Sequence, residues 1–119
     1  MPKPRISPVE GGEAVAHVQA GTATNDTVAL AVRYLLQVLE QSFPGKSVEV
    51  RIPPYGAIQC VEGPEHTRGT PAHVVEMDSH TWVGIATGTV SWDDAVAQGL
   101  LHASGTRSNI SSQLPLAQW

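Results

Sequence analysis

The sequence is poor in the features that mark several classes of protein. Its 119 residues include one cysteine, Cys60, so no disulfide can form within the chain, and we predict a reducing compartment, the cytoplasm. No run of about 18 apolar residues is present, so no membrane-spanning helix is expected. Prolines interrupt the first eight residues and no apolar segment follows them, which argues against a signal peptide.

Charged residues are also scarce, and the negative net charge does not favour nucleic acid as a partner. Charged residues make up 15% of the chain and the formal net charge is −4, whereas nucleic-acid binding needs a basic face. The histidines at positions 66, 73, 80 and 102 show neither the helical spacing nor the alternating strand spacing of metal ligands. We therefore predict neither a metal nor a cofactor.

The residue types that can support catalysis have simpler interpretations here. Cys60 lies inside a predicted strand, where a cysteine is usually a small buried side chain. Asp93 and Asp94 begin a predicted helix, a position that favours acids through the helix dipole. No nucleophile, base and oxyanion donors converge in the sequence pattern. A small hydrolase or isomerase is therefore the least favoured hypothesis, and we predict that the protein is not an enzyme.

Hydrophobic periodicity predicts an α+β domain over residues 27–119, preceded by a tail or marginal helix over 1–26. A helix is predicted over 27–42, because apolar residues recur at helical spacing and polar residues fill the other side. Residues 47–53 alternate, with Val50 and Ile52 on the apolar face, which indicates a strand with one wet side, as in antiparallel sheets. A turn and a second strand over 57–62 would complete a hairpin.

The second half of the chain alternates short strands with short helices. Asp78 and Ser91 are predicted helix caps, and Gly88, Gly99 and Gly105 stand where elements must end. The expected elements are a strand over 73–77, a helix over 79–87, a helix from 92 to Gly99, a strand over 100–104, and a last short helix that ends at Pro115 and places Ile110 and Leu114 on one face.

This order of elements resembles the sterol carrier protein family, in particular its bacterial branch, over about residues 27–117. The resemblance rests on the amino-acid sequence from Val48 to Gly63 and on a later series of positions. That series is Val74-Val75-Glu76-Met77-Asp78, Trp82, Ile85, Thr87-Gly88-Thr89-Val90, Ala95, Gly99, Leu101, Ala103 and Gly105.

The resemblance implies a mostly antiparallel sheet with helices packed on it, enclosing an apolar tunnel for sterols, fatty acids or acyl thioesters. The family sheet has five strands, whereas four are clear here, so the fifth would have to come from the loop 63–71. Lining positions are expected at Val50, Ile52, Trp82, Ile85, Ile110, Leu114 and Leu116, with Arg68 in that loop as a candidate for an anionic head group.

Two functions follow from these expectations. The first is binding or transfer of an apolar ligand, a lipid or another apolar small molecule, in an internal cavity. The second is an accessory domain that has no ligand of its own and works beside a protein partner.

Overall fold

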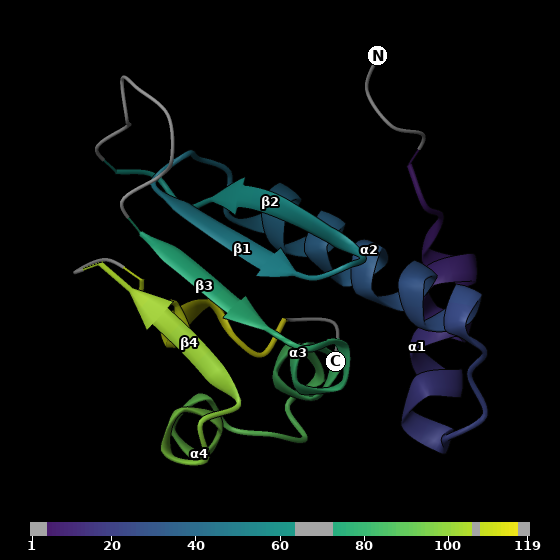
Figure 1. Ribbon diagram of the computed structural model, residues 1–119. Coiled ribbons are helices and arrows are strands. Elements are labelled where there is room, and N and C mark those ends of the chain that lie inside the picture. Colours follow the sequence, from purple (N-terminus) through teal and green to yellow (C-terminus); the bar gives the residue numbers. More distant parts are fainter. Residues whose placement is uncertain (1–4, 64–72, 106–107, 117–119) are drawn as a thin grey trace.

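The protein is described by a computed structural model that covers residues 5–63, 73–105 and 108–116. Two helices are followed by three strands, two shorter helices and a last strand, as Figure 1 shows. In chain order the elements are α1 (Pro8–Ala20), α2 (Asn25–Ser42), β1 (Val48–Ile52), β2 (Gly56–Cys60), β3 (Val74–Met77), α3 (Ser79–Thr87), α4 (Trp92–Ala97), β4 (Leu101–Ser104) and the single 3₁₀ turn η1 (Ser111–Gln113).

The described strands form one sheet in the order β2-β1-β3-β4. β1 pairs antiparallel with β2 as the predicted hairpin, β1 pairs parallel with β3, and β3 pairs antiparallel with β4. The sheet is therefore mixed, and the prediction of a mostly antiparallel sheet is wrong. The alternation in residues 47–53 reports that one face is wet, and it carries no information on the direction of the neighbouring strand. Residues 64–72, from which a fifth strand was expected, lie outside the described part of the chain.

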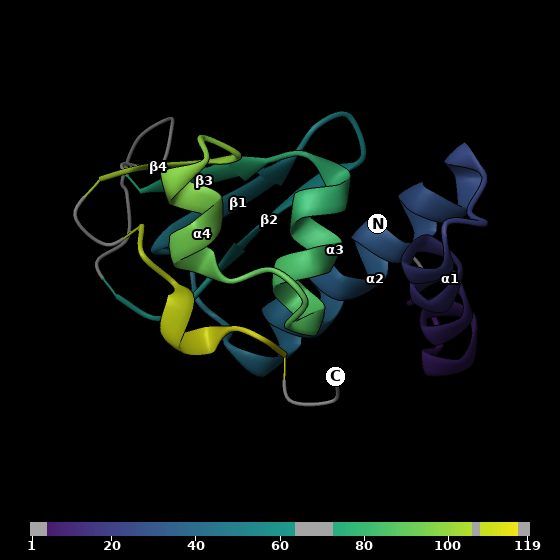
Figure 2. The same ribbon diagram turned by 90° about the horizontal axis from the view of Figure 1, so that it is seen from below.

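Helices cover one face of the sheet (Figure 2). Val48, Val50 and Ile52 of β1 point into this layer and are almost completely buried, together with Val75 and Met77 of β3. The opposite face carries Glu49, Arg51, Glu76 and His102, which the strand registers place side by side. Glu49 accepts a hydrogen bond from Arg51 and raises the pKa of that guanidinium. The hydrophobic core thus lies between the sheet and the helices.

The N-terminal region, predicted as a tail or a marginal helix, contains the 13-residue helix α1. The Ser7 side chain accepts a hydrogen bond from the Glu10 backbone N–H and caps its start, while Gly21 ends it in the left-handed conformation. The glycine pair that weakens the sequence pattern has a packing role. A Cβ at Gly11 would lie 2.1 Å from Cγ of Tyr34, so the glycine lets α1 approach α2 closely.

The caps of the later helices are confirmed, while the predicted last helix is reduced to one turn. The Asp78 side chain accepts from Thr81 N–H and Ser91 from Asp94 N–H, and Gly88 ends α3 with a positive φ. α2 begins at Asn25, two residues before the predicted start at 27, and Thr24 is its cap. Beyond β4 the residues that the structure describes form only η1, because a short run rich in serine has weak helix propensity.

Candidate functional site

Five of the predicted lining residues lie in the packed core rather than around a cavity. Val50, Ile52 and Trp82 are fully buried, and Ile110 and Leu116 are 1% exposed. The five belong to one cluster of buried side chains that contact each other between the sheet and the helices. The Trp82 indole N–H donates to the Val32 carbonyl at 3.2 Å, which fixes α3 to α2 across the core.

The other two described lining residues, Ile85 and Leu114, meet at a surface cleft of about 330 Å³. We call it the C-terminal cleft, because it lies between the α3–α4 region and the last described residues. Trp92 and Ile85 are nearly buried beneath it, and Leu114 is half-buried at its side. Its lining is Ile85, Gly88, Val90, Ser91, Trp92, Asp93, Ser111, Leu114 and Pro115, with Asp93 as the one charged residue of this set.

The cleft is bordered by residues 108–116, which we call the C-terminal segment. Ile110 and Leu116 anchor it in the core, and the Leu116 N–H donates to the Ala86 carbonyl of α3 at 2.9 Å. The remaining backbone hydrogen bonds found within the described residues of this segment are local, such as Gln113 N–H to Ile110 O. The segment is therefore held mainly by apolar side chains, which can release it without breaking a strand ladder.

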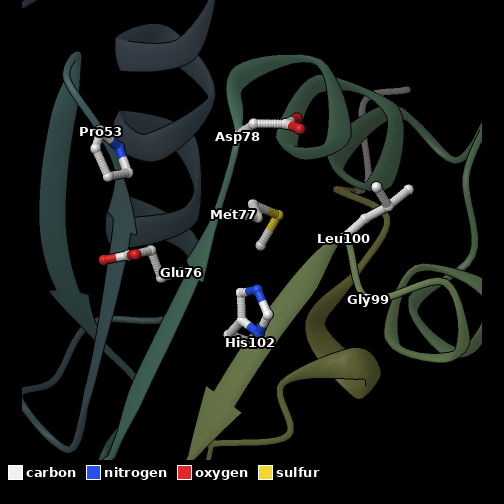
Figure 3. Close-up of a pocket in the computed structure, with 7 residues that line it drawn as sticks. All are labelled: Pro53, Glu76, Met77, Asp78, Gly99, Leu100 and His102. Carbon is white, nitrogen blue, oxygen red and sulfur yellow. The ribbon is translucent and has the colours of Figure 1, made fainter.

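A second cleft, where β3 ends and β4 begins, combines polar and apolar groups (Figure 3). Glu76, Asp78 and His102 line it beside Pro53 and Leu100. The figure shows the Glu76 and Asp78 carboxylates pointing in different directions, and the Asp78 carboxylate is already used as the α3 cap. These groups do not converge on a common point. Within the residues that the structure covers, no group of three or more histidine, cysteine or acidic residues is placed to hold a metal.

Cys60 lies at the end of β2, opposite Val48, and is fully buried. Burial raises the pKa of the Cys60 thiol from 9.0 to about 11, with a smaller contribution from the Glu40 carboxylate. The thiol is therefore protonated at neutral pH, and it packs as an apolar group. Arg68, the predicted head-group residue, lies outside the described residues.

Residues 24–116 match a protein family described as bacterial SCP ortholog. The chain belongs to the sterol carrier protein family. The match covers α2 to the end of the C-terminal segment and leaves α1 outside it, and the family is a carrier type of domain. No curated protein is similar enough to this member of the family to match it. Within the described part of this sterol carrier domain, no helix is long and apolar enough to cross a membrane.

The sequence interpretation of this sterol carrier domain missed two contributors to the C-terminal cleft. Trp92, which directly follows the Ser91 cap, is not among the lining positions expected from the sequence. Pro115 was expected only to end the last helix, yet it lies beside Gly88, where a Cβ would be in ordinary van der Waals contact with its Cγ at 3.4 Å. A tryptophan directly after a helix cap could have been identified from the sequence as a cleft residue. The contact of Pro115 with Gly88 could not, because no local sequence pattern indicates it.

Proposed function

We propose that this sterol carrier domain binds a neutral apolar ligand in the C-terminal cleft and has no catalytic activity. The observation that carries the proposal is that Ile85 and Leu114, both expected from the sequence to line a ligand site, border one cleft with Trp92 at its base. Its volume of about 330 Å³ falls at the lower end of small-molecule sites, which measure roughly 300–1,000 Å³.

The ligand would enlarge this site by displacing the C-terminal segment. Ile110 and Leu116 fill the space beneath the segment, and one backbone hydrogen bond, from Leu116 to Ala86, connects the end of the segment to α3 in the described structure. A long apolar molecule that replaces these side chains would keep the core free of water. Binding of this kind selects by shape and apolar area.

The charge of the cleft favours a neutral ligand, such as a sterol, over a fatty carboxylate. Asp93 is the charged group that borders the cleft, and a buried carboxylate near it would be repelled. Arg68 stays a prediction as a partner for an anionic head group. Replacing it by alanine should then weaken binding of fatty carboxylates and leave neutral sterols unaffected.

The second candidate is an accessory domain that works beside a protein partner without a ligand. The dense packing of the core favours it, since Val50, Ile52 and Trp82 are fully buried against their neighbours. The clefts described above, which are bordered by described residues, are open to solvent rather than enclosed. Under this hypothesis, neither a sterol nor a long-chain alcohol would bind to the purified protein.

A fluorescent sterol titration with two paired variants tests the proposal. Leu114→Asp places a charge in the cleft at a half-buried position, and we expect it to weaken sterol binding at least tenfold, about 1.4 kcal/mol. Ser112→Asp adds the same charge at an exposed position two residues away and should leave binding unchanged. Native mass spectrometry of the purified protein would identify a retained lipid. Absence of sterol and alcohol binding in the parent protein would support the accessory domain instead.

A further inference from the structure

The net negative charge of the protein comes from one part of the chain, residues 73–105. This stretch contains four acidic residues and neither lysine nor arginine, whereas the rest of the chain contains seven acids and seven lysines or arginines. Glu76 lies in β3, Asp78 caps α3, and Asp93 and Asp94 are in the first turn of α4. All four residues are exposed. The part of the molecule that contains β3 and α4 therefore carries the excess of negative charge at its surface.

The same part of the molecule exposes two large apolar side chains. Val96 and Leu100 are 48% and 41% exposed, and they are two of the four large apolar residues that are exposed within the described ranges. Two backbone hydrogen bonds close the turn that ends α4: Gly99 N–H donates to Val96 O at 3.1 Å, and Leu100 N–H donates to Ala95 O at 2.9 Å. Leu100 is thus held beside the last turn of α4, although solvent reaches its side chain.

Leu100 also borders the cleft where β3 ends and β4 begins, which we call the β3–β4 cleft (Figure 3). Its volume is about 320 Å³, and it combines the apolar residues Pro53, Met77 and Leu100 with the acids Glu76 and Asp78. Lysine and arginine have long apolar stems and charged ends. A cleft that offers apolar surface beside carboxylates therefore suits one of these two side chains.

The acids of this region are available to a cation from another molecule. Arg51 lies opposite Glu76 in the sheet, but its guanidinium donates a hydrogen bond to Glu49 and forms an ion pair with it. Glu76 itself has no ion-pair partner among the described residues. The same holds, within the described ranges, for Asp93 and Asp94 of α4.

We infer that the exposed side of α4 and the β3–β4 cleft form one docking surface, the α4 surface, for a basic segment of a protein partner. Apolar side chains of the segment pack on Leu100 and Val96, while its lysine or arginine side chains face Glu76 and the acids of α4. α4 has six residues and is about 9 Å long, whereas a stable interface buries about 800 Å² on each partner, so one partner can cover both areas. The inference does not depend on ligand binding in the C-terminal cleft.

Charge distinguishes this partner from other occupants of the α4 surface. Two copies of the protein that met through this surface about a two-fold axis would bring the acids of one copy against those of the other. The anionic leaflet of a membrane and the phosphates of nucleic acid would be repelled in the same way. A basic protein segment instead brings opposite charges together as it covers the apolar side chains.

Fluorescence anisotropy of the full chain with a labelled synthetic peptide of leucine and arginine tests the inference. The double variant Val96→Ser/Leu100→Ser should weaken peptide binding by about tenfold or more, because a few apolar contacts contribute most of the affinity of an interface. Val9→Ser is the matched control, since Val9 is 70% exposed and lies in α1, on the opposite side of the molecule from α4 (Figures 1 and 2). Its peptide binding should equal that of the parent.

A pair of charge variants tests the electrostatic part without a change of packing. Asp94→Asn should weaken peptide binding by about threefold at low salt, because an exposed charge pair contributes modestly. This difference should disappear at high salt, which screens exposed charges. Asp26→Asn removes an acid from the equivalent first turn of α2 and should leave peptide binding unchanged. A peptide with glutamine in place of arginine should bind the parent more weakly.

Three results would overturn the inference. The first is absence of peptide binding in the parent, or equal binding by Val96→Ser/Leu100→Ser and Val9→Ser. The second is loss of peptide binding in Leu114→Asp, which would place the peptide in the C-terminal cleft. The third is a dimer of the parent in analytical ultracentrifugation that Val96→Ser/Leu100→Ser dissociates, which would assign the surface to a second copy. Sterol binding in Val96→Ser/Leu100→Ser should equal that of the parent, so a failure of this inference is distinguishable from a failure of the proposed function.

Discussion

At the scale of single residues, the adjacent glycines of α1 illustrate how burial decides the role of an amino acid. Gly11 is buried against the Tyr34 ring, whereas no atom lies within 4 Å of a Cβ built at Gly12. Both weaken an isolated helix by a similar amount, because glycine loses more conformational freedom on folding than other residues. Only Gly11 compensates for this loss by permitting a close helix contact.

Alanine at these two positions should therefore change stability in opposite directions. Gly12→Ala should stabilise the protein by about 0.5–1 kcal/mol through helix propensity. Gly11→Ala should destabilise it by about 1–3 kcal/mol, because the added methyl overlaps the Tyr34 ring and forces α1 away from α2. Urea denaturation of the two variants measures both effects. Equal stabilisation by the two substitutions would contradict the α1–α2 contact.

The buried thiol of Cys60 predicts a loss of stability at high pH. Its pKa is raised from 9.0 to about 11 in the folded protein, so folding favours the protonated form. This contribution to stability is complete below about pH 9 and is lost as the pH rises toward 11. The pH slope of the free energy of unfolding between these values should be smaller in Cys60→Ala, which removes the titrating group. Iodoacetamide should also alkylate the native thiol far more slowly than the urea-unfolded thiol.

At the scale of elements, the alternation of β1 predicts which face is buried, and the structure confirms it. Val48, Val50 and Ile52 are covered by helices, while Glu49 and Arg51 lie on the opposite face. The direction of the neighbouring strand is not recorded in this alternation, and β3 lies parallel to β1.

A charge on the covered face of the sheet should unfold the protein. Val50→Asp buries an unpaired carboxylate among helices and strands and should destabilise by several kcal/mol, about 3 or more. Gln59→Asp makes a comparable change on an exposed position of the neighbouring strand, and its melting temperature should stay within a few degrees of the parent. Thermal unfolding followed by circular dichroism distinguishes the two, and equal melting temperatures would contradict the assignment of the covered face.

At the scale of the whole molecule, the C-terminal segment connects the core to the proposed ligand site. Truncation after Ser112 removes Leu114 and Leu116, and loss of one fully buried leucine should destabilise by about 1.5–3 kcal/mol. The truncated protein should remain folded, because the sheet and helices α1 to α4 are intact, and should bind sterol at least tenfold more weakly than the parent. Circular dichroism and sterol titration test these two outcomes separately, and unchanged sterol binding in the folded truncation would argue against a role of the C-terminal segment in ligand binding.

The sequence by itself determined most elements of this protein, the covered face of β1, the caps at Asp78 and Ser91, and the family. These features depend on periodicity and on neighbours within one helical turn, which the order of residues records directly. Only the tertiary structure decided the parallel pairing of β1 with β3, the clamp of Ile6 by Gln37 and the burial of Ile110 and Leu116. Those contacts join residues far apart in the chain, such as 6 and 37, and they depend on how the elements approach one another in space rather than on any local pattern.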